Sequence, residues 1–225
     1  MLYRMSKNKL KQPVLIYMYG IPGAGKSMLS HNIANELGAA IVSADRLRYE
    51  LFEESRHDKT ELHVITQLMH YMTEEFLRAG VSVIYDMSVS RMVDRKELRE
   101  LAKRMHAKEM MIWLQVDIET AWVRGRKRAK RKPEDRYAHI LTPDQFKQYV
   151  KIMQNPHNEP YIVVSGKHQY SSQKTTIVRR LIEMGILDID ATGHIVAKPE
   201  LVNLVSRAQA QAGRVDYTRR NIKIQ

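Results

Sequence analysis

Residues 14–27 read Val14-Leu15-Ile16-Tyr17-Met18-Tyr19-Gly20-Ile21-Pro22-Gly23-Ala24-Gly25-Lys26-Ser27. The first six form an uninterrupted apolar run of strand length, which is typical of a parallel strand buried on both faces. The last eight fit the pattern G-x-x-x-x-G-K-[ST], in which glycines let backbone N–H groups curl around phosphate oxygens. The segment therefore predicts a strand that leads into a phosphate-binding loop.

An amphipathic helix is expected after this loop, because Leu29, Ile33 and Leu37 recur every fourth residue before Gly38. Its positive N-terminal end adds to the attraction for phosphate. ATP is the predicted ligand. Lys26 is expected to reach its β- and γ-phosphates, and the Ser27 hydroxyl is expected to ligate Mg²⁺. The predicted nucleotide contacts are Gly20, Gly23, Ala24, Gly25, Lys26, Ser27 and Met28.

Strands and helices alternate along the rest of the chain. Further strands are predicted at residues 39–43, 81–85, 110–116 and 161–165, with helices over 62–76, 94–105, 143–153 and 177–182. Asp94 with Glu97 resembles a capping box, and Thr142-Pro143-Asp144-Gln145 reads as another helix start. Repeated β-α units predict an α/β fold: a P-loop NTPase three-layer α/β/α sandwich with a five-stranded, mainly parallel sheet.

Composition limits the classes of protein to consider. The chain contains no cysteine, which excludes disulfides and thiolate metal sites. The apolar run after Lys7, Lys9 and Lys11 ends in the glycine loop, and no segment approaches about 18 uninterrupted apolar residues. We therefore expect a cytoplasmic protein without a membrane partner.

The net charge of +12 is concentrated in one short segment. Seven basic residues and no acidic residue lie within 124–132: Arg124, Arg126, Lys127, Arg128, Lys130, Arg131 and Lys132. A helical, basic lid over about 124–142 could close over ATP and exclude water. The basic run is either a solvated lid surface with one or two working arginines, or a patch that tracks nucleic-acid phosphates. Trp113 is expected in the core rather than as a base-stacking platform.

Two aspartates follow predicted strands. In parallel sheets ligands bind beyond the carboxyl ends of the strands, and Asp45 and Asp86 both fall there. Phosphoryl transfer needs a carboxylate to accept the acceptor's proton and another group to hold the metal. Asp45 is the candidate base, with Arg46 and Arg48 near an anionic acceptor, and Asp86 is the candidate ligand of metal-bound water. The alternative is that each aspartate only caps a helix or starts a turn.

These features together resemble the P-loop kinases of the polynucleotide-kinase type, an AAA-33-like ATP-binding family related to zeta-toxin-like and small-metabolite kinases. The resemblance covers roughly residues 13–165. It implies that Asp45 is the general base and that Arg48 holds the acceptor's phosphate. It also implies that Arg124 lies near the adenine and Arg128 on the transferring phosphoryl group. The chain differs from the family at Asp86-Met87-Ser88, where Asp-x-Asn is common; Asp86 and Ser88 are the expected acceptor contacts there.

The expected activity is therefore transfer of the ATP γ-phosphate to a hydroxyl, catalysed by Asp45, Lys26 and Arg128. A nucleic-acid 5′-hydroxyl is the favoured acceptor, and a small metabolite or nucleotide sugar is the alternative. A regulatory ATP-binding module without transfer activity is a further alternative. An ATPase coupled to movement is disfavoured, because its third strand would lead into Asp-Glu rather than Asp86-Met87.

The chain is expected to divide into a kinase-like domain, residues 1–185, and a C-terminal extension, residues 186–225. The extension reads as a hairpin near Thr192-Gly193 followed by a helix over 199–212. A small subdomain packed on the core and a partner-binding arm are both compatible with this pattern.

Overall fold

The sheet is the frame of the molecule. The computed structural model describes residues 10–127, 137 and 139–187. The five strands are all parallel and lie in the order β2-β3-β1-β4-β5. Their bounds are β1 Val14–Tyr19, β2 Ala40–Ser43, β3 Val83–Ser88, β4 Lys108–Gln115 and β5 Ile162–Ser165. The predicted parallel sheet is therefore confirmed.

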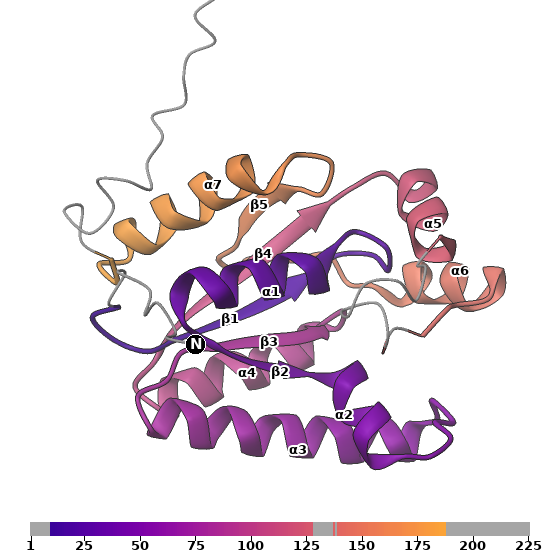
Figure 1. Cartoon of the computed structure of the whole chain (residues 1–225), viewed down its shortest axis with the longest axis horizontal. Coiled ribbons are helices and arrows are strands. Elements are labelled where there is room, and N and C mark those ends of the chain that lie inside the picture. Colours follow the sequence, from indigo (N-terminus) through magenta and orange to yellow (C-terminus); the bar gives the residue numbers. More distant parts are fainter. Residues whose placement is uncertain (1–9, 128–136, 138, 188–225) are drawn as a thin grey trace, which may run out of the picture.

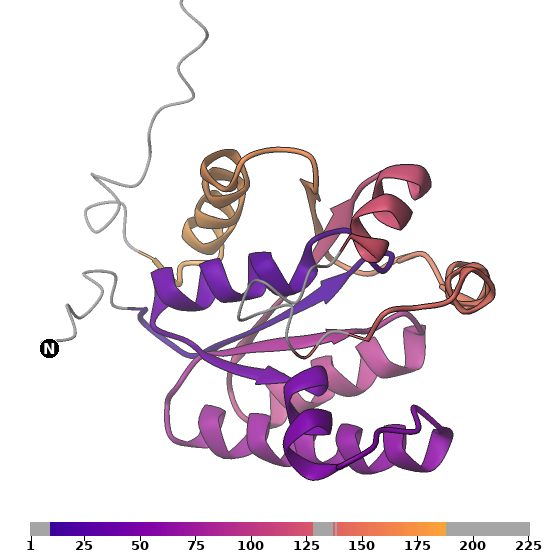
Figure 2. The same ribbon diagram turned by 45° about the vertical axis from the view of Figure 1, so that its right-hand side comes forward.

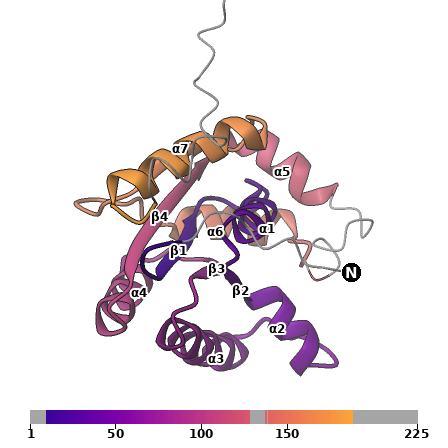
Figure 3. The same cartoon turned by 60° about the vertical axis from the view of Figure 1, so that its left-hand side comes forward.

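Helices cover both faces of this sheet, which confirms the predicted sandwich (Figure 1). One face carries α1 (Lys26–Leu37) and α7 (Tyr170–Glu183), and the other carries α3 (Lys59–Arg78) and α4 (Met92–Arg104) (Figure 3). The shorter helices α2 (Ala44–Leu51), α5 (Ile118–Arg126) and α6 (Pro143–Ile152) lie toward the carboxyl ends of the strands (Figure 2). Among the described residues, none of the helices combines the length and the apolar character that a membrane span requires.

Strand β1 supplies both layers of the core, as its continuous apolar run predicts. Val14, Ile16 and Met18 pack with the layer of α1 and α7, whereas Leu15, Tyr17 and Tyr19 pack with the layer of α3 and α4. All six side chains are buried. The loop that follows β1 therefore starts from the most enclosed strand of the sheet.

Strand β3 differs from its predicted bounds. It begins at Val83 and continues to Ser88, whereas the prediction began it at Val81 and ended it at Asp86. Its pairing with β1 shifts register at this point, because Met18 pairs with Ser88 whereas Tyr17 pairs with Tyr85. A register irregularity of this kind re-aims side chains and is frequent beside active sites.

Two helix starts test the capping predictions. The helix start predicted at Thr142 is confirmed, and Thr142 forms a full capping box with Gln145 there. The prediction for Asp94 is wrong: α4 begins after Arg91, without a side-chain cap, and the Asp94 carboxylate instead pairs with the Arg91 guanidinium at 2.6 Å. Because α4 begins at Met92, Asp94 lies in the first turn of the helix and not at its N-cap.

Helix α2 was not expected from the sequence pattern. It is eight residues long and buries only Ala44, so it carries no apolar stripe to reveal it. At the other end of the described chain, Ile186 and Leu187 are buried in the layer of α1 and α7, and the Lys11 N–H donates to the Ile186 carbonyl at 3.0 Å. The predicted hairpin and helix of the extension, beyond residue 187, lie outside the described residues.

Candidate active site

The glycine loop connects β1 to α1 at the carboxyl end of the sheet. Gly23 and Gly25 adopt positive φ angles of 85° and 101°, which favour glycine. A Cβ atom on Gly23 would lie 2.0 Å from the Ala121 carbonyl oxygen of α5. The loop therefore keeps its shape only with glycine at position 23, and it lies directly against the backbone of α5.

Lys26 begins α1 and folds back over the loop. Its Nζ donates to the carbonyl oxygens of Gly20 at 2.8 Å and Ile21 at 3.0 Å. The Ser88 hydroxyl donates to the same Gly20 oxygen at 3.2 Å. Ser88, a predicted acceptor contact, thus joins the end of β3 to the phosphate loop.

Asp86 lies at the centre of the site, where its carboxylate accepts hydrogen bonds from Ser30 at 3.1 Å and Ser43 at 3.4 Å. Burial raises the pKa of this carboxyl, and the negative charge of Asp45 raises it further. Hydrogen bonding by Ser30, the Lys26 charge and hydrogen bonding by Ser27 oppose that rise in the pKa. The structure therefore brings together the predicted metal ligands Ser27 and Asp86, with Lys26 and Asp45 close by.

Asp45 lies in the first turn of α2, three residues before Arg48. The Arg48 Nη1 group donates to Asp45 at 3.3 Å, and its Nε donates to Glu61 at 3.0 Å. The Asp45 side chain is 38% exposed, whereas that of Arg48 is 14% exposed. Asp45 is thus the accessible carboxylate of the pair, and Arg48 is held between two carboxylates.

Glu61 was missed by sequence reasoning, although it anchors this corner of the site. It accepts from the Ser55 hydroxyl at 2.6 Å and from the backbone N–H groups of Arg56 and His57 at 2.7 and 3.1 Å. Burial acts to raise the pKa of Glu61, but these hydrogen bonds and the Arg48 charge lower it overall. The Asp58-x-x-Glu61 pattern was the available signal, because Asp58 caps α3 by accepting from the Glu61 N–H.

A second unpredicted group fixes the chain between α6 and β5. Arg95 is fully buried and forms an ion pair with Glu159 at 2.7 Å, and Arg99 reaches the same carboxylate at 2.5 Å. Arg95 also donates to the carbonyl oxygens of Val89 and Ser90, both at 3.2 Å. Neither arginine stands in a motif, so only the folded chain reveals the cluster.

Of the two predicted lid arginines, Arg124 lies within the described residues. Arg124, on α5, donates to the Gly166 carbonyl at 2.7 Å. This contact connects the start of the basic run to the turn after β5. Arg128 and most of the predicted lid, residues 128–136 and 138, lie outside the described residues. Met28, expected at the nucleotide, is largely exposed on α1.

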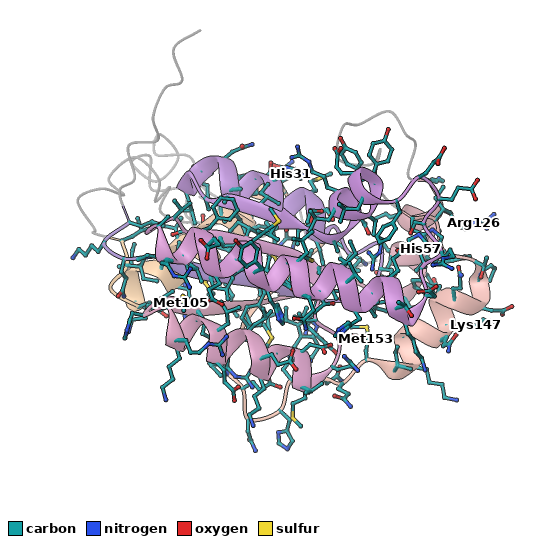
Figure 4. All side chains as sticks on the ribbon, turned by 90° about the horizontal axis from the view of Figure 1, so that it is seen from below. His31, His57, Met105, Arg126, Lys147 and Met153 are labelled. Carbon is teal, nitrogen blue, oxygen red and sulfur yellow. The ribbon has the colours of Figure 1, made fainter. Side chains whose placement is uncertain are left out.

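Two described residues of that predicted lid, Tyr137 and His139, contact residues in α2 and in the segment after it. Tyr137 packs edge-on against Tyr49 at 4.9 Å between ring centroids, and His139 packs against His57 at 3.9 Å between ring centroids, with the rings tilted by 37°. Burial lowers the pKa of His57, as do the neighbouring His139 and Arg48. His57, Arg126 and Lys147 lie toward one end of the molecule and Met105 toward the other (Figure 4).

The strand order, the glycine loop and the paired carboxylates define a P-loop protein with a kinase-like fold. The family model described as an AAA domain, AAA_33, matches residues 15–154. The chain therefore belongs to the AAA_33 family, which confirms the predicted resemblance. No curated protein matches the chain in sequence.

Solved structures with the same fold are distant in sequence. A sugar kinase from Janibacter sp. HTCC2649 is 18% identical, with a TM-score of 0.54 over 78% of this chain and 95% of that one. Chaetomium thermophilum Kti12 in complex with ADP-AlF3 is 16% identical, with a TM-score of 0.60 over 76% and 98% of the two chains. The APS kinase CysC of Mycobacterium tuberculosis, in complex with AMPPNP and APS, is 14% identical, with a TM-score of 0.54 over 76% and 98%. At these identities the likeness establishes the fold.

Proposed function

We propose that this chain is an ATP- and Mg²⁺-dependent phosphotransferase that moves the γ-phosphate of ATP to a hydroxyl acceptor. The observation that carries the proposal is the pair of carboxylates at the phosphate loop, one enclosed (Asp86) and one accessible (Asp45). Phosphoryl transfer asks the protein for positioning and charge stabilisation rather than covalent chemistry. The phosphate loop, Asp45, Asp86 and Lys26 are groups that can position a triphosphate and stabilise its charge.

Ser27 and Asp86 are the residues that would hold Mg²⁺. This ion prefers oxygen ligands and usually combines one or two carboxylates with phosphate oxygens and water. Burial raises the pKa of the enclosed Asp86 carboxyl. A bound cation would favour the ionised form of this group, so Asp86 is suited to be the carboxylate ligand of Mg²⁺. When bound, Mg²⁺ would neutralise negative charge on the triphosphate. The described residues contain no cluster of three or more His, Cys, Asp or Glu that could hold a metal without phosphate.

Asp45 is assigned as the base that accepts the proton of the acceptor hydroxyl. Its exposure leaves room for an acceptor, whereas Asp86 is enclosed. Arg48 orients Asp45 through its 3.3 Å contact, and Glu61 holds Arg48 from the other side. Binding of an acceptor phosphate by Arg48 remains part of the proposal, as do adenine contact by Arg124 and phosphoryl contact by Arg128.

A nucleic-acid 5′-hydroxyl is the acceptor that we favour, since residues 124–132 carry seven positive charges. A small metabolite or nucleotide sugar is the second candidate. Its supporting observation is that Arg48 already faces two carboxylates, so less of its charge is available to an acceptor phosphate. A cytoplasmic location is proposed from the absence of cysteine.

Transfer of γ-labelled phosphate tests this function directly. The wild-type protein is incubated with labelled ATP and Mg²⁺, beside a 5′-hydroxyl oligonucleotide, its 5′-phosphorylated form, and a pool of nucleosides and metabolites. We expect Asp45→Asn to lower transfer by about 10²–10⁴-fold while ATP affinity stays nearly unchanged. Asp144→Asn, at an exposed aspartate of α6, is the matched control and should retain activity.

The pattern of label separates the candidates. Label on the 5′-hydroxyl oligonucleotide alone supports a polynucleotide kinase. Label only in the small-molecule pool supports a kinase with a different acceptor. ATP binding without label in any acceptor would overturn the proposal and leave a regulatory ATP-binding module.

A further inference from the structure

A cavity of about 580 Å³ opens beside the phosphate loop, at the carboxyl ends of β1 and β4. Gly20 and Ile21 of the loop form one wall, and Val150 and Met153 at the end of α6 form another. Met153 lies at the point where the chain leaves that helix (Figure 4). Gly20 and Ile21 are shared with the phosphate loop described above, and none of the other site residues discussed so far lines this cavity.

An aromatic wall is already in place inside it. Trp113, predicted as a core residue, is only partly buried and lines the cavity. Tyr19 packs against Trp113 at 5.4 Å between ring centroids and an interplanar angle of 85°, and Tyr161 packs at 5.4 Å and 63°. Two neighbours thus hold the indole, so a planar ring could stack on it with little loss of side-chain freedom.

Two side-chain amides line the same cavity. The Tyr19 hydroxyl donates to the Asn155 Oδ1 atom at 2.8 Å, so the Asn155 amide presents its N–H donors to a ligand. Gln115, the last residue of β4, is the second amide and is exposed. Asp117 also lines the cavity, but its carboxylate pairs with Lys167 at 2.5 Å and accepts from the Thr120 N–H. The groups offered to a ligand are therefore mainly neutral amides beside an aromatic ring.

We propose that this cavity binds a nucleobase of the acceptor, so that the acceptor is a nucleoside or the 5′-hydroxyl end of a nucleic acid. An aromatic face with Asn and Gln amides is the chemistry that recognises a base by stacking and by hydrogen bonds to its edge. The assignment rests on the proposed phosphotransferase function and narrows its acceptor.

The cavity shares a wall with the carboxylate site. Gly20 lines the cavity, and its carbonyl oxygen accepts the hydrogen bonds from Lys26 and Ser88. On α6, Tyr149 precedes the cavity residue Val150. Burial raises the pKa of the Tyr149 phenol most, hydrogen bonding with Ser88 lowers it, and the charge of Asp45 raises it. A base bound in the cavity would therefore lie next to the groups assigned to transfer.

Fluorescence of Trp113 gives a test that does not depend on transfer. The chain has two tryptophans, so Trp122→Phe leaves Trp113 as the only indole. This variant is titrated without ATP, separately with adenosine, guanosine, cytidine, uridine and a 5′-hydroxyl trinucleotide, and with D-ribose as a control that lacks a base. We expect a saturable change in emission with at least one base-containing probe and none with ribose.

Substitutions then locate the response. On the Trp122→Phe background, Gln115→Ala and Asn155→Ala should each weaken the affinity measured from the emission change by about tenfold. Each substitution removes one contact to the edge of the base. The matched controls are Gln148→Ala on α6 and Asn35→Ala on α1, both at exposed positions, and they should leave the response unchanged. Equal weakening by controls and cavity variants would overturn the assignment.

Two further measurements are needed. One distinguishes a base of the acceptor from the adenine of ATP, and the other distinguishes the base site from the proposed phosphotransferase activity. The response should persist when the protein is saturated with a non-hydrolysable ATP analogue; its abolition would place the donor's adenine in the cavity and overturn the assignment. Absence of any response would also overturn it, even in a protein that transfers phosphate. A response without transfer to any acceptor supports the base site and overturns the kinase instead.

Discussion

Asp86 and Glu159 are both enclosed carboxylates, but their surroundings differ. Glu159 forms ion pairs with the guanidinium groups of Arg95 and Arg99. Burial acts to raise the pKa of Glu159, but the two arginines lower it overall. Asp86 receives the hydroxyls of Ser30 and Ser43, and its pKa is raised by burial and by the charge of Asp45. The difference separates a completed structural ion pair from a carboxylate whose charge is only partly compensated.

The location of Glu159 explains why full compensation of its charge stabilises the structure. Its ion pair ties the chain after α6 to the start of α4, where the Met92 N–H also donates to the Gln154 side chain at 2.7 Å. The Gln154 N–H in turn donates to the Ser90 carbonyl at 2.9 Å. The segment that borders the cavity is thus fixed to the strand that carries Asp86.

Of the substitutions that test this comparison of Asp86 with Glu159, Asp86→Asn should have the largest effect on activity. Without the carboxylate, the proposed metal site loses its only charged protein ligand, so transfer should fall by about 10²–10³-fold. Transfer of labelled phosphate is measured over a series of Mg²⁺ concentrations, with the melting temperature as a check on folding. Wild-type rates of transfer by Asp86→Asn at ordinary Mg²⁺ concentrations would show that Asp86 has a structural role, like Glu159.

Arg95→Met should have the largest effect on stability. It leaves Glu159 enclosed with one guanidinium fewer, which should lower the free energy of unfolding by about 3–5 kcal/mol. Urea unfolding measures the loss. Arg91→Met is the matched control, because Arg91 forms an exposed pair with Asp94 and should cost about 1 kcal/mol or less. Similar losses in both variants would contradict the special position of Glu159.

The two carboxylates should respond to pH with opposite signs. Because the pKa of Asp86 is raised in the folded protein, ionised Asp86 lowers the stability of the fold above that raised pKa. This loss of stability is absent below 3.8, the ordinary pKa of an aspartate. The lowered pKa of Glu159 means that its contribution is present above the ordinary value of 4.5 and is lost as the pH falls through the lowered pKa.

Urea unfolding of wild-type and variant proteins between about pH 7 and pH 3, in Mg²⁺-free buffer, measures both effects. Asp86→Asn should be more stable than wild type at pH 7, and Arg95→Met should be less stable. Both differences should shrink in acid. A loss of stability in Asp86→Asn at pH 7 would reverse the sign that we assign to Asp86.

Ser30→Ala should have the smallest effect. It removes one hydrogen-bond donor from Asp86, so it should lower the free energy of unfolding by about 1 kcal/mol and raise the pKa of Asp86 further. More Mg²⁺ should then be needed for half-maximal transfer. Ser171→Ala, at an exposed serine of α7, provides the control. No change in the Mg²⁺ requirement would separate Ser30 from the metal site.

Much of the fold could be predicted because its signals are local. The apolar run of β1 and the glycine pattern identified the loop, and Thr142 with Gln145 identified the start of α6. The strand ends brought Asp45 and Asp86 to one edge, as parallel strands require. The roles assigned to these residues stay predictions.

The rest depends on contacts between distant parts of the chain. Glu159 lies 64 residues from Arg95, and no periodicity links them. Asn155 meets Tyr19 across 136 residues, so the cavity could not be foreseen from either segment. Helix α2 escaped prediction for a different reason: it is held by Arg48 and Glu61 rather than by an apolar stripe.

The contact between Gly23 and Ala121 has a mechanical consequence. The two backbones lie so close that a shift of the phosphate loop toward α5 would displace that helix. Helix α5 carries the first residues of the basic run. For the proposed phosphotransferase, we therefore expect a change of loop shape on triphosphate binding to reach the first residues of that run, and we expect the nucleotide to bind before the acceptor.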